Sequence, residues 1–156
     1  MVSATNTRIL ECLKHTQANV VCQYLNAKRW HWFAYGPLFR DLHLLFDELA
    51  MVSQAQIDPF GERLRILGGE PVSAPDEISG AITIVISRTK GTPAEMLSEA
   101  LQSERKIVEE MREGARVAGE EQDYGTNDLF ATAMQEHEKY VWFLEEAMRR
   151  GDGLVS

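Results

Sequence analysis

Apolar residues recur at intervals of three and four along most of the chain, and this spacing is typical of amphipathic helices. The pattern predicts four long helices, over about residues 5–33, 37–67, 93–115 and 128–150. The second segment shows the rhythm most clearly, at Leu38, Leu42, Leu45, Leu49 and Val52. Helices with one apolar stripe are stable when they bury that stripe against each other, so an all-α bundle is expected.

The connections between these helices have unequal lengths. Gly36-Pro37 ends the first helix and starts the second at once, which places the two helices antiparallel. A long connection, Gly68–Gly91, leads to the third helix, where Thr92 and Glu95 form a capping box. A long crossover between two short loops is the layout of a ferritin-like four-helix bundle. We expect residues 1–156 to form one such domain.

The crossover contains one apolar stretch, Ile78–Ile86. By propensity, Thr83–Ile86 fits a strand. A single strand has no partner in a helical chain, so we favour a short helix within this stretch, between the second and third long helices.

Composition excludes several classes of protein. The net charge of −8 argues against a uniformly basic surface for nucleic acid. No apolar run approaches the roughly 20 residues of a membrane helix, and the first residues do not resemble a signal peptide, so we expect a cytoplasmic protein. Cys12 and Cys22 are too few for a disulfide framework and are interpreted as structural thiols.

Two pairs of polar residues on the second segment are candidate metal ligands. His43 and Asp47 are one helical turn apart, as are Asp58 and Glu62, and His31 precedes the short hinge. Carboxylates at this spacing also occur on ordinary solvated faces, so that interpretation stays open. The midpoints of the two pairs are about 22 Å apart on one helix, so a single chain cannot bring both to one metal. Two antiparallel copies related by a two-fold axis can do so.

At these residues the sequence resembles the Dps family, the DNA-binding proteins from starved cells, also called mini-ferritins. The resemblance covers nearly the whole chain. Its motifs are Trp30-His31-Trp32, Gly36-Pro37, Leu42-His43, Asp47-Glu48, Asp58, Glu62-Arg63, Gly68-Gly69 and, near the last helix, Thr126-Asn127-Asp128-Leu129 and Tyr140-Val141-Trp142.

The resemblance implies a ferroxidase that oxidises Fe(II), usually with hydrogen peroxide, and stores ferric mineral inside a hollow homododecamer. It implies intersubunit iron sites with His31, His43 and Asp47 from one subunit and Asp58 and Glu62 from its two-fold neighbour. It also implies that Trp32 lies near this centre, and that Asp123 and Asp128 are the nearest matches to acidic pore residues. The same ligands accept zinc, and the residues do not decide between peroxide and dioxygen.

The sequence departs from the family motif at two positions near Asp58 and Glu62, and two alternative functions are compatible with the fold. Pro59 and Gly61 lie between the two residues of the second pair, and Asp58-Pro59 also fits the start of a new helix. One alternative function is a nucleoid protein that compacts DNA with little or no ferroxidase activity. The first nine residues contain only one basic residue, Arg8, which argues against DNA binding. The other alternative is a bundle that only oligomerises. His15 and His137 are interpreted as structural.

Overall fold

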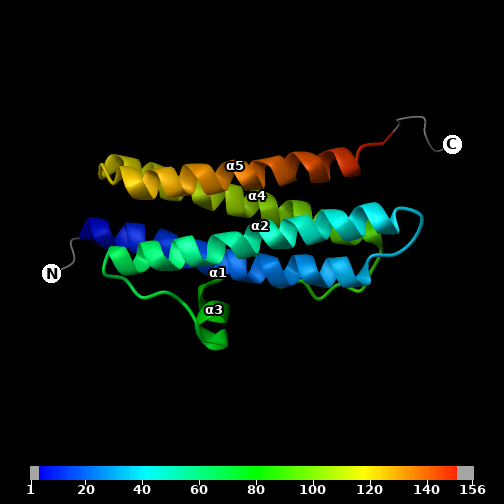
Figure 1. Cartoon of the computed structure of the whole chain (residues 1–156), viewed down its shortest axis with the longest axis horizontal. Coiled ribbons are helices and arrows are strands. Elements are labelled where there is room, and N and C mark those ends of the chain that lie inside the picture. The colour runs from blue at the N-terminus through cyan, green and yellow to red at the C-terminus, as the bar shows by residue number, and fades with distance from the viewer. Residues whose placement is uncertain (1–3, 151–156) are drawn as a thin grey trace.

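The computed structural model describes residues 4–150, with side chains from Asn6 onward. It contains four long helices and one short one, α1 (Ala4–Phe33), α2 (Phe39–Ile66), α3 (Pro75–Ala81), α4 (Pro93–Glu120) and α5 (Tyr124–Ala147). The long helices form two antiparallel pairs, α1 with α2 and α4 with α5, and α3 lies outside the bundle (Figure 1). Within residues 4–150 there is no strand, and no helix is long and apolar enough to span a membrane. The expected all-α, ferritin-like fold is confirmed.

Local signals fix the helix ends close to the expected positions. Gly36 adopts a φ of +91° in the hinge between α1 and α2, a conformation that glycine reaches without strain. Thr92 accepts a hydrogen bond from the Glu95 main-chain N–H, and Glu95 accepts one from the Thr92 N–H, as the capping box predicted. Asp123 caps α5, which starts a few residues earlier than expected.

Helix α2 runs without interruption through Pro59. The Ala55 carbonyl, which loses its usual N–H partner to the proline, belongs to an exposed residue that water can reach. Phe60 and Leu64 lie on the core side, at 0% and 1% exposure. Burial of two such side chains outweighs the roughly 3 kcal/mol cost of an internal proline. The alternative of a new helix starting at Asp58 is therefore wrong.

The crossover contains the expected short helix, α3, and Thr83–Ile86 after it is neither helix nor strand. Two asparagines of α1 supply the partner that a lone strand lacks. Asn19 accepts a hydrogen bond from the Thr83 N–H at 2.8 Å, and Asn26 donates to the Val85 oxygen at 2.8 Å. The expected short helix is therefore α3, which takes up the first part of the apolar stretch, and side-chain amides hold Thr83–Ile86 in place of a neighbouring strand.

The bundle core consists of two apolar clusters with a buried polar layer between them. One cluster includes Leu13 and Phe60, and the other includes Trp30 and Phe46. The polar layer is formed by Gln23 of α1, Gln56 of α2, Glu104 of α4 and His137 of α5. His137 contacts Glu104 through Nδ1 at 2.7 Å, with both side chains fully buried, which agrees with the structural interpretation of this histidine.

Candidate metal centre

The hinge places the two candidate histidines face to face. His31 lies in the last turn of α1 and His43 in the first turns of α2, and their stacked rings have centroids 3.6 Å apart. Nδ1 of His31 donates to the His43 carbonyl at 2.7 Å, and Nδ1 of His43 donates to the His31 carbonyl at 2.9 Å. A carbonyl oxygen only accepts, so each Nδ1 carries the proton. In the neutral rings this leaves both Nε2 lone pairs available to a metal.

Asp47 lies one turn beyond His43 and is paired with a lysine that the sequence analysis did not single out. Lys28 of α1 donates a hydrogen bond to its carboxylate. This hydrogen bond, aided by the lysine charge and opposed by partial burial, lowers the pKa of Asp47. Lys28 precedes His31 by three residues, so the two share a helix face and approach α2 together. That spacing is the signal by which Lys28 could have been found.

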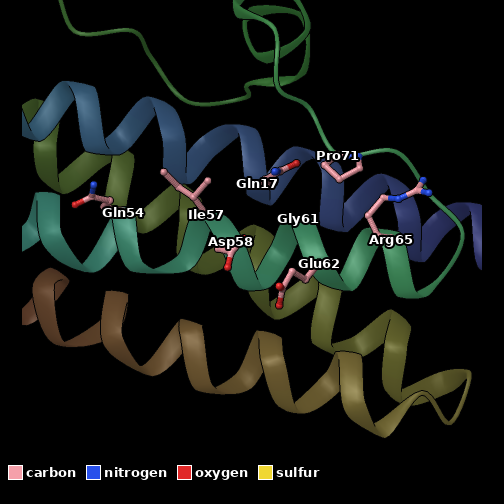
Figure 2. Close-up of a pocket in the computed structure, with 8 residues that line it drawn as sticks. All are labelled: Gln17, Gln54, Ile57, Asp58, Gly61, Glu62, Arg65 and Pro71. Carbon is pink, nitrogen blue, oxygen red and sulfur yellow. The ribbon is translucent and has the colours of Figure 1, made fainter.

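Asp58 and Glu62 lie elsewhere on the same helix. Both are exposed, and both line a pocket of about 520 Å³ between α1, α2 and Pro71 (Figure 2). The histidines and Asp47 lie close together near the hinge, about 22 Å along α2 from this pair. Among residues with described side chains, no three His, Cys, Asp or Glu residues form a complete metal cluster.

One stripe of α2 runs from Asp47, beside the hinge histidines, to the Asp58 and Glu62 pair. Asp47, Met51, Gln54, Asp58 and Glu62 follow one another at intervals of three or four, so they share one face. Met51 is 54% exposed, so no helix within residues 4–150 covers this part of the stripe. The flanking Ala50 and Ser53 are buried within the chain's own bundle. Within one protomer, the stripe presents half a ligand set at each end.

Asp123, the nearest match to a pore carboxylate, is engaged within its own chain. It accepts hydrogen bonds from the Thr126 N–H at 3.0 Å and from Arg63 at 2.6 Å. Burial raises the pKa of Asp123, but the hydrogen bonds from Thr126 and the Arg63 charge outweigh it, and the net shift is downward. Asp123 therefore caps α5 and ties it to α2, whereas Asp128 is exposed.

Two comparisons place the chain among known proteins by sequence. Residues 10–153 match the model of the ferritin-like domain. DNA protection during starvation protein 2 of Bacillus anthracis is 30% identical over 140 residues, which are 89% of this chain and 95% of that protein. The DNA protection during starvation protein of Brevibacillus brevis is 31% identical over 133 residues, which are 85% of this chain and 89% of the relative.

Solved structures agree with the sequence matches. Dps from Thermosynechococcus elongatus superposes with a TM-score of 0.94 at 44% identity, covering 99% of this chain and 100% of that one. A Vibrio cholerae Dps, described as a member of the ferritin-like diiron-carboxylate superfamily, superposes with a TM-score of 0.87 at 25% identity, covering 93% and 91%. The fold and these matches define a ferritin-like protein. Within that class, the chain belongs to the Dps family, as the sequence motifs predicted.

Proposed function

We propose that this chain is a cytoplasmic ferroxidase that oxidises Fe(II) and stores the ferric mineral inside a homododecamer built from two-fold dimers. The observation that carries the proposal is the exposed stripe of α2, with nitrogen and oxygen donors at one end and two carboxylates at the other. An antiparallel pairing of two such stripes brings unlike ends together. Each dimer then has two identical sites.

In this arrangement His31, His43 and Asp47 of one subunit face Asp58 and Glu62 of its neighbour. The donor set fits iron, because imidazole nitrogen and carboxylate oxygen suit Fe(II), and hard anionic oxygen also favours the Fe(III) product. The reciprocal hydrogen bonds at Nδ1 keep both Nε2 atoms directed away from the hinge backbone. The same donors accept Zn(II), which we expect to compete with iron.

We propose hydrogen peroxide as the preferred oxidant. Two Fe(II) ions give one electron each, the O–O bond breaks, and two protons from solvent complete two molecules of water. The products are two Fe(III) ions, which then hydrolyse to mineral. Paired one-electron donors avoid the release of hydroxyl radical, and dioxygen is the slower alternative oxidant.

The test is anaerobic titration with Fe(II), followed by peroxide, for the wild type and for the His31→Ala/His43→Ala variant. The wild type is expected to bind Fe(II) at stoichiometric sites and to form mineral, and the variant is expected to lose tight binding. His15→Ala is the matched control, because His15 is exposed and its Nδ1 contacts the Ala81 carbonyl at 2.7 Å, far from the candidate ligands along α1. Equal binding by the wild type and the double variant would contradict the proposal.

DNA compaction is the competing function for a member of this family. The charge of −8 on each chain is multiplied in an oligomer and repels phosphate. We expect no gel shift of duplex DNA near physiological salt, and a clear shift there would favour the nucleoid function instead.

A further inference from the structure

One buried polar group faces the carboxylate pocket and has no role in the ligand set described above. Gln17 of α1 is only 5% exposed, yet it lines the same pocket as Asp58 and Glu62. Figure 2 shows Gln17 on the α1 side of this pocket and the two carboxylates on the α2 side, with Gly61 between them.

A main-chain contact fixes the orientation of the Gln17 amide. Its Oε1 accepts a hydrogen bond from the Val72 N–H at 2.9 Å. A main-chain N–H only donates, so the atom facing it must be the oxygen, and the other end of the amide must be the NH2 group. Nε2 is therefore a donor with two hydrogens.

Gly61 makes room for this donor. A Cβ atom built on Gly61 would lie 2.9 Å from Nε2 of Gln17, closer than side-chain atoms normally approach. Among the described residues, the Gln17 side chain makes its hydrogen bond through Oε1, and Nε2 is left facing the pocket. The glycine before Glu62, which departs from the family motif, thus lets an amide group of α1 reach a pocket with two carboxylates.

No buried side-chain nitrogen or oxygen among the described residues lacks a partner, so Nε2 is open to the pocket, where it can donate to an oxygen-bearing molecule. We propose that Gln17 donates a hydrogen bond to hydrogen peroxide and thereby favours peroxide over dioxygen as the oxidant. The oxygen atoms of peroxide are good acceptors, whereas dioxygen is apolar and accepts hydrogen bonds poorly. Gln17 forms and breaks no covalent bond in this role, and the electrons come from iron as described above. The inference rests on the proposed function, because it needs iron at Asp58 and Glu62.

The sharpest variant is Gln17→Glu, which keeps an oxygen for the Val72 N–H and removes the NH2 donor. Initial rates of Fe(II) oxidation are measured against peroxide and against dioxygen. We expect KM for peroxide to rise about three- to tenfold, the amount that one hydrogen bond between neutral groups contributes, with the dioxygen rate unchanged. Ser73→Glu is the matched control, because it adds the same charge at an exposed position next to Val72 and lies outside the stripe of α2.

A second variant, Gly61→Ala, displaces Nε2 without adding charge and favours the helical conformation of α2. It is expected to shift the ratio of peroxide to dioxygen rates in the same direction as Gln17→Glu. An unchanged ratio in both variants would overturn the proposal, as would equal slowing with both oxidants, which indicates a structural role only.

Anaerobic Co(II) binding separates this inference from the proposed function. Both variants are expected to bind Co(II) with wild-type stoichiometry, since neither removes a ligand. If the wild type itself binds no Co(II) in a manner that depends on His31 and His43, the proposed function fails, and this inference fails with it. If that binding is intact and only the oxidant preference fails to change, the role of Gln17 alone is wrong.

Discussion

His31 and His43 hold each other's imidazole in place, because each Nδ1 donates to the main-chain oxygen of the other residue, at 2.7 and 2.9 Å. The two rings are therefore one unit across the hinge between α1 and α2. Loss of either side chain removes a candidate ligand and the ring that stacks on the other imidazole, whereas the main-chain acceptor of the other Nδ1 remains.

This coupling predicts a large effect of single substitutions. His43→Ala is expected to lower the affinity for Fe(II) or Co(II) by about 100-fold or more, since it removes one ligand and the ring that stacks on the second. Isothermal titration under anaerobic conditions measures this, with His15→Ala as the control. A loss below about tenfold would mean that the histidines are not ligands.

Lys28 is expected to weaken metal binding, because its positive charge already occupies one side of the Asp47 carboxylate. Lys28→Met should tighten Co(II) binding by about two- to fivefold, a modest change because Asp47 is partly exposed. The exposed Lys14, on the same helix, provides the control variant Lys14→Met. Weaker binding by Lys28→Met would show that the lysine supports the site and does not compete with the metal.

Asp123 is expected to stabilise the fold rather than to conduct iron. Asp123→Ala should cost about 1–2 kcal/mol through loss of the α5 cap, and Asp123→Asn should cost less, since asparagine also caps helices. The free energy of unfolding measures both. Equal costs would assign the effect to the ion pair with Arg63 instead of the cap.

The same carboxylate predicts a pH dependence. Its pKa is lowered in the native state from an ordinary value of 3.8, so the unfolded chain binds the proton more tightly. The contribution of Asp123 is therefore complete above the unfolded pKa and is lost as the pH falls through the lower native pKa. The stability difference between wild type and Asp123→Ala should be constant above about pH 5 and shrink below about pH 4. A constant difference down to pH 2 would contradict this sign.

The buried contact between Glu104 and His137 is expected to couple α4 to α5. His137→Leu leaves the Glu104 carboxyl buried without its imidazole partner and should cost about 3–5 kcal/mol of unfolding free energy. The Glu104→Leu/His137→Leu variant should cost less than the two single changes added together. Additive costs would mean that the two side chains do not interact.

The fold was predictable where the signals are local. Gly36, the capping box of Thr92 and Glu95, and the three-and-four spacing of apolar residues each act within a few residues. The path of Thr83–Ile86 was not predictable from local pattern, because its partners, Asn19 and Asn26, lie on another helix. Such long-range pairing leaves no trace in local periodicity.

The candidate site likewise contains residues that local spacing predicts and residues that only contacts between helices reveal. His43 and Asp47 are linked by helical spacing, which the sequence displays directly. Lys28 acts across the α1–α2 contact and was visible only through its spacing from His31. No sequence pattern marks Gln17, because its proposed role depends on two contacts with distant residues. Gly61 leaves room for its amide, and the Val72 N–H orients that amide.

The central claim, that two subunits share each site, is tested most directly by mixing two inactive proteins. One carries His31→Ala/His43→Ala and the other carries Asp58→Ala/Glu62→Ala, and the two are unfolded and reassembled together. A mixed dimer has one site with every donor and one that keeps only Asp47, so random mixing should restore about a quarter of the wild-type Co(II) sites. Recovery of that fraction is the predicted result, and a mixture that binds no more Co(II) than its separate components would contradict the shared site.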